Sequence, residues 1–288
     1  MSVSKTMSSL SWSPSSAKLR SWGHLQIGGG GQAGIYRAIY NGKVLDDYLL
    51  KVFRNEYYLA DLQRSWKKNI AATTLSWKFV INNSCITEHG TLLQDGRFAF
   101  ILKLCWGDLR SAIDLAILKD KTYQSSPIPG MKLLHDRGIL HKDLKGENCL
   151  LSNNLKWLLV LGSLCMVADF DSPEGVIGTG FWRAPEILLG LKNRVRDLSS
   201  HPGVWTKKVD VYSYAMTCYE ILRGCIPFEG RATNDYDGVI CGERPSLPDY
   251  VDLELRELVT ICRQSEPLLT PTFKEIVNKL WRISPKFN

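Results

Sequence analysis

The spacing of apolar residues changes about one third of the way along the chain. The first part holds short runs rich in aromatic and β-branched residues, at positions 35–40, 48–53, 85–93 and 97–104. Asn41-Gly42 separates the first pair of runs and Asp95-Gly96 the second pair, and both dipeptides favour tight turns between antiparallel strands. This part of the chain is therefore predicted to form β-hairpins.

After Trp106 the apolar residues recur at helical spacing. The clearest helix is predicted over 206–223, ending at Gly224, because glycine readily takes the left-handed conformation that follows a helix. A last helix is predicted to begin with Thr270 as its N-cap and Pro271 in its first turn, before an apolar face that runs from 273 to 283. A small antiparallel β-rich part followed by a larger, mainly helical part predicts an α+β fold.

Composition places the chain among globular proteins. With 288 residues and 44% apolar side chains it can bury a sizeable core, and its net charge of +7 is spread along the chain, which argues against nucleic-acid binding. The eight cysteines stand singly, as expected in a reducing compartment. The longest apolar run, 157–168, is too short for a transmembrane segment. The cytoplasm is the expected location.

The first 23 residues are rich in serine and basic residues, and no acidic residue occurs before Asp46. A disordered tail over 1–23 explains this composition. Plastid targeting and peripheral membrane association are less favoured alternatives, because strand-like patterning already begins near His24.

A glycine run is the first candidate for chemistry: Gly28, Gly29, Gly30 and Gly31. Glycine backbone N–H groups can approach phosphate oxygens closely, although a flexible linker has the same composition. A strand rather than a helix follows the run, which argues against a dinucleotide-binding or Walker-type loop. Lys51 lies on the next strand, where a lysine taken alone is most often a surface residue.

The decisive segment runs from His141 to Asn148. Within it, the carboxylate of Asp143 is followed two positions on by Lys145 and five positions on by the amide of Asn148. Phosphoryl transfer needs such a set: a carboxylate to orient the acceptor hydroxyl, a cation near the transferring phosphate and an oxygen ligand for magnesium.

Two further fragments follow in order, Asp169-Phe170-Asp171 and then Gly178-Thr179 through Ala184-Pro185-Glu186. Each alone could be an ordinary polar loop. Together with the glycine run, Lys51 and the 141–148 loop, they resemble the signature set of the eukaryotic protein kinase family over about 24–283. Lys145 and Thr179 resemble the serine/threonine type, and 178–186 is most similar to plant tyrosine-kinase-like (Raf-like) kinases.

The resemblance implies a two-lobed fold, with a β-rich N-lobe over 24–104 and a helical C-lobe over 105–288. It implies ATP and Mg²⁺ (or Mn²⁺), with Asp143 as the catalytic carboxylate and Lys145 beside the γ-phosphate. The implied metal ligands are Asn148 and Asp169. The implied ATP contacts are the glycine run, Ile35, Lys51, Lys103, Leu104 and Cys105. Thr179 and Glu186 would belong to the substrate-binding segment, and Asp210 would brace the catalytic loop from a helix.

Several positions depart from the family pattern. The glutamate expected on a helix after Lys51 is not found where it should be, and Asp171 replaces a glycine. Lys142 replaces the usual arginine, and a lysine cannot form the two parallel hydrogen bonds with which an arginine binds a phosphorylated segment. Thr270 stands where an arginine would pair with Glu186. The missing glutamate, Asp171 and the lost partner of Glu186 favour the alternative of a pseudokinase that acts as a nucleotide-binding or scaffolding module.

The retained catalytic set favours an enzyme. The chain is thus expected to be an ATP-dependent protein serine/threonine kinase in signalling, acting on protein substrates under upstream signalling partners. Two length anomalies stay open, since the apolar insert 157–164 and the prolines at 127 and 129 fit either a real feature or a gene-model error.

Overall fold

A computed structural model describes the chain over the following residues: 26–29, 33–40, 43–53, 87–92, 97–115, 128–151, 157–159, 166–167, 178–193 and 204–283. The chain divides into two compact units, of which one comprises 1–71 and 87–104 and the other 72–86 and 105–288. The tail 1–23, the segment 54–86 in which the helix after Lys51 was expected, and the Asp169–Asp171 triplet lie outside the described residues.

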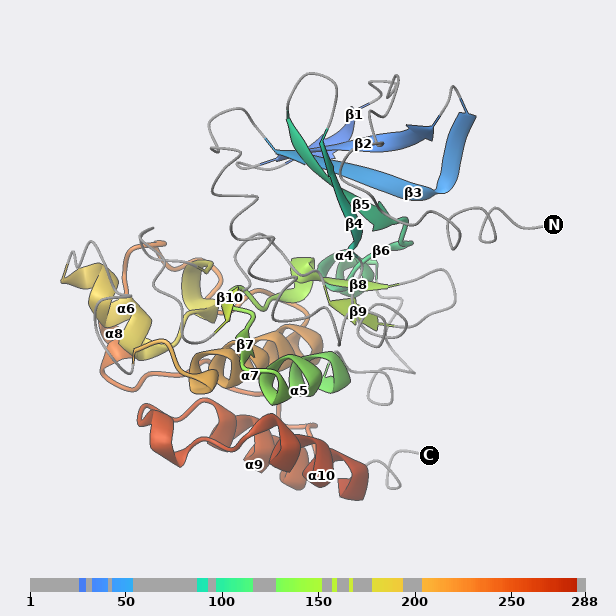
Figure 1. The fold of residues 1–288 in the computed structure, drawn as a ribbon. Coiled ribbons are helices and arrows are strands. Elements are labelled where there is room, and N and C mark those ends of the chain that lie inside the picture. Colours follow the sequence, from blue (N-terminus) through green and yellow to red (C-terminus); the bar gives the residue numbers. More distant parts are fainter. Residues whose placement is uncertain are drawn as a thin grey trace. The chain divides into compact units, whose positions relative to one another are not determined.

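The described strands of the first unit form a five-stranded antiparallel sheet (Figure 1) in the order β1-β2-β3-β5-β4. Their bounds are Gln26–Gly29, Ala33–Tyr40, Lys43–Phe53, Thr87–Leu92 and Phe98–Lys103 for β1 to β5. Tyr40 pairs with Lys43, and β4 pairs with β5, so both predicted hairpins are confirmed. Leu50, Val52 and Ala99 form a small core on the sheet, because alternate side chains of a strand point to the same face.

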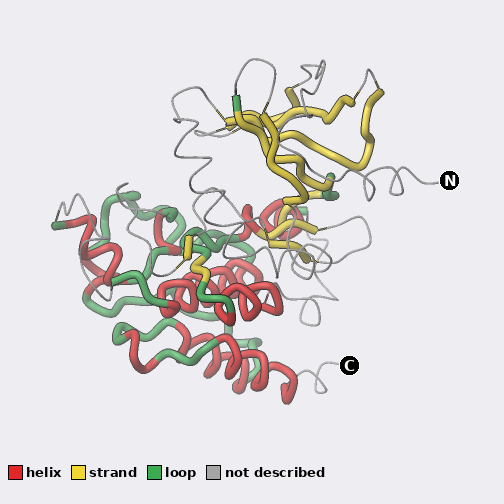
Figure 2. Tube along the Cα trace, in the orientation of Figure 1, coloured by secondary structure: helices red, strands yellow, loops and turns green. Residues whose placement is uncertain are grey.

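The second unit is mainly helical, as the red segments of Figure 2 show. Its helices are α4 (Leu109–Asp114), α5 (Ile128–Asp136), α6 (Pro185–Lys192), α7 (Lys207–Arg223), α8 (Asp237–Ile240), α9 (Leu253–Cys262) and α10 (Phe273–Ile283). Short 3₁₀ turns are η1 (Gly146–Asn148), η2 (Gly180–Trp182) and η3 (Pro267–Leu269). Together with the sheet of the first unit, these helices confirm the expected α+β fold.

Short strands of the second unit flank the segment 141–148. Their bounds are Gly107–Asp108, Ile139–Leu140, Cys149–Leu151, Trp157–Leu159 and Met166–Val167 for β6 to β10. β8 pairs with both β6 and β9, and β7 pairs with β10. The segment that carries Asp143 therefore leaves β7 and enters β8. The first three residues of the apolar insert form β9, and 160–165 lie outside the described residues.

Helix α7 is the centre of this unit and matches its prediction. Thr206 caps its N-terminus by accepting a hydrogen bond from the Lys208 N–H, and Gly224 ends it with φ 83°. Most of its side chains are buried, which is the pattern of a helix that other elements surround. An element packed on all sides can fix the position of several loops at once.

The expected N-cap of the last helix is wrong by two residues. α10 begins at Phe273, and Thr272 caps it: the Thr272 hydroxyl accepts a hydrogen bond from the Glu275 N–H, and the Glu275 carboxylate accepts one from the Thr272 N–H. This reciprocal pair satisfies two backbone donors, whereas Pro271 has no N–H to offer. Thr270 instead lies at the end of η3.

Candidate active site

The start of the 141–148 loop is fixed by Asp210, in the first turn of α7. The Asp210 carboxylate is fully buried and accepts hydrogen bonds from the N–H groups of His141 and Lys142, each at 2.8 Å. His135 Nε2 lies 2.8 Å from the same carboxylate. Lys142 has φ 65°, an uncommon conformation for a residue other than glycine, and these hydrogen bonds hold the turn in place.

The charge of Asp210 is compatible with its burial because of these donors. Burial alone would raise its pKa, but the hydrogen bond and charge of His135, together with His141, hold the pKa below the ordinary value. A buried ionised carboxylate that accepts hydrogen bonds from backbone N–H groups is a rigid anchor. Asp210 therefore holds the backbone N–H groups of His141 and Lys142 in place.

The catalytic candidates Asp143 and Asn148 lie side by side. Asn148 Nδ2 donates hydrogen bonds to the backbone oxygen of Asp143 at 2.6 Å and to its Oδ2 at 3.0 Å. The hydroxyl of Thr179 donates to the other carboxylate oxygen, Oδ1, at 2.7 Å. The carboxylate of Asp143 is thus oriented from one side and receives a threonine hydroxyl on the other.

Lys145 lies beside an exposed acid. Its Nζ is 2.5 Å from Oε2 of Glu147, whose side chain is 63% exposed, whereas that of Lys145 is 15% exposed. An exposed ion pair of this kind contributes little to stability and can exchange for another anion. Lys145 can therefore turn from Glu147 to a phosphate without a large energetic cost.

The structure also shows a residue that the sequence reading missed, Glu220 near the end of α7. Its Oε2 accepts hydrogen bonds from the Gly146 N–H at 3.0 Å and from Trp182 Nε1 at 2.8 Å. The Gly146 amide, which belongs to the 141–148 loop, thus donates to a carboxylate of helix α7. A signal was present in the sequence: Ser213, Thr217 and Glu220 form a polar stripe at i, i+4 and i+7 within a helix otherwise predicted to be buried.

Two departures from the family pattern can be followed in the second unit. Lys142 is buried, and its Nζ lies 4.5 Å from the centre of the Trp205 ring, a cation–π contact. Burial raises the pKa of Glu186, whereas the positive charge of Arg244 lowers it. Thr270 replaces the arginine expected to pair with Glu186, but Arg244 still supplies a positive charge that acts on this carboxylate. The backbone oxygen of Thr270 accepts a hydrogen bond from Lys208 Nζ.

In the first unit, three predicted ATP contacts lie in one row across the sheet. Gly28 on β1 pairs with Ile35 on β2, and Ile35 pairs with Lys51 on β3. Lys103 ends β5, and Leu104 and Cys105 follow it as half-buried residues. Gly29 ends β1, whereas Gly30 and Gly31 lie outside the described residues, as does Asp169.

The side-chain amide of Asn148 presents an oxygen of the kind that suits a metal ion. Because Nδ2 donates to Asp143, the amide oxygen is the group left to face a cation, and hard divalent cations prefer oxygen ligands. Among the described residues no group of three or more His, Cys, Asp or Glu side chains could hold a metal ion. A single amide oxygen at Asn148 fits a cation that binds substrate phosphates together with few protein ligands.

Comparison with known proteins supplies the context of this site. Residues 24–282 match the family model described as protein kinase domain. The chain is 32% identical over 213 residues to a light-sensor protein kinase of Ceratodon purpureus, covering 63% of this chain and 16% of that protein. It is 28% identical over 270 residues to the dual specificity protein kinase pyk3 of Dictyostelium discoideum, covering 91% of this chain and 18% of that protein.

A third relative is the serine/threonine/tyrosine-protein kinase HT1 of Arabidopsis thaliana, 30% identical over 151 residues, which cover 51% of this chain and 36% of that protein. The chain thus spans well under half the length of these curated relatives. None of the helices described here is long and apolar enough to cross a membrane.

Proposed function

Because the chain belongs to the protein kinase domain family, we propose that it transfers the γ-phosphate of ATP to serine and threonine hydroxyls of protein substrates in signalling. The observation that carries the proposal is the environment of Asp143. One carboxylate oxygen is held by Asn148, and the other accepts a hydrogen bond from the Thr179 hydroxyl. A carboxylate held in this way can orient the hydroxyl of an acceptor residue and accept its proton during transfer.

The remaining roles follow from charge and ligand type. Lys145, released from Glu147, would stabilise the negative charge of the transferring phosphate. Asn148 and Asp169 would hold Mg²⁺ (or Mn²⁺), which neutralises phosphate charge and orients the phosphates when it is bound.

The nucleotide contacts are assigned to the first unit and to the residues that follow β5. The row Gly28, Ile35 and Lys51 would contact the phosphates and the adenine, with Lys51 on the α- and β-phosphates. Lys103, Leu104 and Cys105 would contact the adenine. We place this activity in the cytoplasm, because the cysteines stand singly in the sequence.

One assay separates an enzyme from a pseudokinase. Transfer of labelled γ-phosphate to a generic basic protein is measured for wild type, Asp143→Asn and Asp169→Asn, with magnesium or manganese. Asp143→Asn should abolish transfer and leave nucleotide binding nearly intact, because the carboxylate orients the hydroxyl rather than binding ATP. Asp169→Asn should also weaken metal-dependent binding. Equal activity in wild type and Asp143→Asn would remove the enzymatic proposal and leave the scaffolding role.

The acceptor residue is tested on the same samples. Lys145 and Thr179 resemble the serine/threonine type, so autophosphorylation should fall on serine and threonine, with Ser172, Thr179 and the N-terminal serines as candidates. Phosphotyrosine as the main product in mass spectrometry would contradict this assignment.

A further inference from the structure

Two carboxylates of helix α7 hold the two ends of the catalytic loop. Asp210 accepts hydrogen bonds at the start of the loop, and Glu220 accepts one from the Gly146 N–H at its end. The two acids are ten residues apart on one helix, about 15 Å along its axis. Asp143 and Lys145 lie between these anchor points, so the position of both depends on both acids.

Glu220 also holds a second segment. Its Oε2, which accepts from Gly146, accepts from Trp182 Nε1 at 2.8 Å, and Ser213 of the same helix donates to the backbone oxygen of Trp182 at 2.8 Å. Thr179, whose hydroxyl contacts Asp143, immediately precedes the turn η2 that contains Trp182. One buried oxygen thus joins the catalytic loop to the segment that faces it.

The Glu220 carboxylate comes close to the loop backbone at Gly146. A Cβ added to Gly146 would lie 2.9 Å from Oε1 and 3.2 Å from Oε2 of Glu220, so the end of the Glu220 side chain would have to shift. Glycine at 146 therefore allows this close approach of the carboxylate to the Gly146 N–H.

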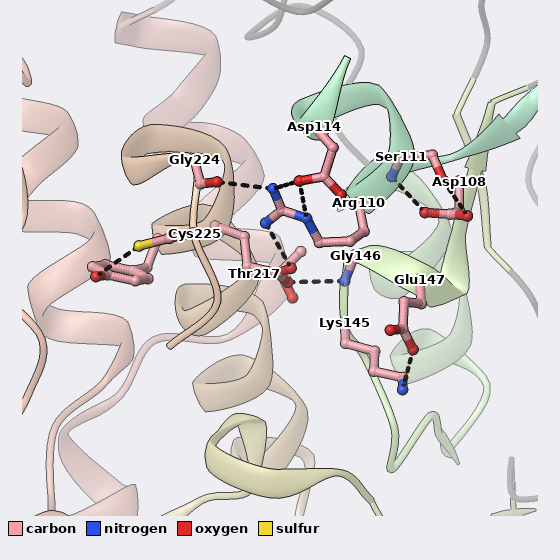
Figure 3. Close-up of polar contacts among 12 residues, drawn as sticks. Asp108, Arg110, Ser111, Asp114, Lys145, Gly146, Glu147, Thr217, Gly224 and Cys225 are labelled. Atoms are coloured by element: carbon pink, nitrogen blue, oxygen red, sulfur yellow. Dashed lines mark hydrogen bonds and ion pairs between the residues drawn. The ribbon is translucent and has the colours of Figure 1, made fainter. Parts of the chain in front are cut away.

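Arg110 supplies the opposite charge. Its Nη1 lies 3.7 Å from Glu220 Oε1 and is buried with no hydrogen-bond partner in the described part of the chain. The rest of the guanidinium is held in place (Figure 3), since Nη2 donates to Asp114 at 2.5 Å and to the Gly224 oxygen at 2.8 Å. Arg110 cannot turn away, so it stays directed at the carboxylate.

We propose that Glu220 is a positioning residue for phosphoryl transfer: its ionised carboxylate sets the catalytic loop and the Thr179 segment relative to each other through Gly146 and Trp182. The inference rests on the proposed kinase function. Hydrogen bonds to an ionised acceptor are shorter and stronger than those to a neutral one. Protonation of Glu220 therefore loosens both segments at the same time.

The protonation state of Glu220 changes near neutral pH. Burial raises its pKa to about 7, although the hydrogen bonds from Gly146 and Trp182 and the charge of Arg110 oppose the rise. Glu147 raises the pKa of Glu220 further. Glu220 also lies near the buried thiol of Cys149, whose own pKa is raised by burial and then by the charge of Glu220. A proton would reside on Oε1, because Oε2 already accepts two donors, and there it would face the N–H groups of Arg110.

Activity and stability should therefore respond to pH in opposite directions. The folded pKa of Glu220 lies above its ordinary value of 4.5, so the folded protein binds more protons than the unfolded chain between those two values. The contribution of Glu220 to stability then falls as pH rises from about 4.5 to about 7, while transfer rises as the carboxylate ionises. A residue with only a structural role would make activity follow stability.

The first experiment compares wild type, Glu220→Gln and the matched exposed variant Glu257→Gln. Glu220→Gln should lower kcat by about tenfold to a hundredfold, the effect of a displacement of about 1 Å, with little change in KM for ATP. It should also lack the acid limb near pH 7 that is expected in the pH–rate profile of wild type. Glu257→Gln should match wild type. A Glu220→Gln enzyme with the wild-type rate and pH profile would overturn the inference.

A second variant keeps the test valid if Glu220→Gln does not fold. Trp182→Phe removes one donor to the carboxylate and should move the midpoint of the pH profile to higher pH, because that hydrogen bond lowers the pKa of Glu220. An unchanged midpoint in Trp182→Phe would count against the proposal.

A third readout does not depend on activity. The chain has nine tryptophans, so the indole N–H signal of Trp182 can be assigned in a proton–nitrogen NMR spectrum by its loss in Trp182→Phe. This signal should titrate near pH 7 in wild type and stay constant in Glu220→Gln. If wild type transfers no phosphate, the kinase proposal fails, yet titration of this signal still supports the ionisable contact between Glu220 and Trp182. An indole signal that does not titrate between about pH 6 and 8 would overturn the inference about Glu220.

Discussion

Replacing Asp210 by asparagine tests the central anchor of the fold. In wild type, Oδ2 accepts from the His141 N–H and contacts His135 Nε2, and Oδ1 accepts from the Lys142 N–H. Asparagine has one oxygen. If that oxygen takes the place of Oδ2, the new NH₂ group faces the buried N–H of Lys142, and two donors meet.

The cost can be worked from these contacts. An unsatisfied buried donor costs about 1–3 kcal/mol, and two hydrogen bonds to a charged acceptor become neutral ones of about half their strength. Easier burial of a neutral amide offsets part of this loss. We expect Asp210→Asn to lower the free energy of unfolding by about 3 kcal/mol, which lowers the Tm by about 6–12 °C for a domain of this size.

The assay is urea unfolding together with thermal unfolding of wild type, Asp210→Asn and Asp249→Asn. Asp249 is exposed, so its variant should stay within about 0.5 kcal/mol of wild type. The pKa of Asp210 is below its ordinary value of 3.8, so the stabilisation by its charge is fully present above that value and is lost as pH falls through the folded pKa. The difference between wild type and Asp210→Asn should therefore shrink below about pH 4.

The reasoning would be refuted by a loss of stability no larger than that of Asp249→Asn at neutral pH. It would also be refuted by a difference that stays constant down to pH 3, because the charge of Asp210 would then contribute nothing to the anchor.

Four further changes have defined outcomes. Thr272→Ala should lower the free energy of unfolding, measured in urea, by about 1 kcal/mol, because α10 loses its N-cap. Thr272→Ser keeps a capping hydroxyl and should retain most of the wild-type stability. Gly224→Ala should lower the free energy of unfolding by about 1–2 kcal/mol in the same measurement, because alanine is strained at the φ of 83° that this position has. No atom lies close to the position of the added Cβ, so backbone strain is the only effect expected, and an unchanged unfolding midpoint would contradict this. Asp171→Gly should change the single-turnover transfer rate by about tenfold or less, because screening limits the effect of its charge to about 1–2 kcal/mol. Lys51→Met should remove transfer, and a retained rate would show that this lysine does not contact the phosphates.

Local signals in the sequence were sufficient for much of the architecture. Asn41-Gly42 predicted a hairpin, and the structure pairs Tyr40 with Lys43. The helix predicted over 206–223, with its end at Gly224, agrees with α7 to within a residue. The sequence predicted that Asp143 and Asn148 lie in one tight loop, and in the structure their side chains are in contact. These features depend on residues a few positions apart in the chain, so they can be predicted from the sequence without the fold.

Tertiary structure alone decided which distant segments share a partner. Glu220 receives donors from residues 74 and 38 positions away in the sequence, and Asp210 from residues 69 and 68 positions away. The sequence identified Asp210 only through its family position and did not identify Glu220. Hydrophobic periodicity shows that α7 is buried, but a buried helix tolerates an acid only where donors from other segments surround it. That condition is a property of the packed chain, because the free energy of burying a charge is set by groups brought together in folding.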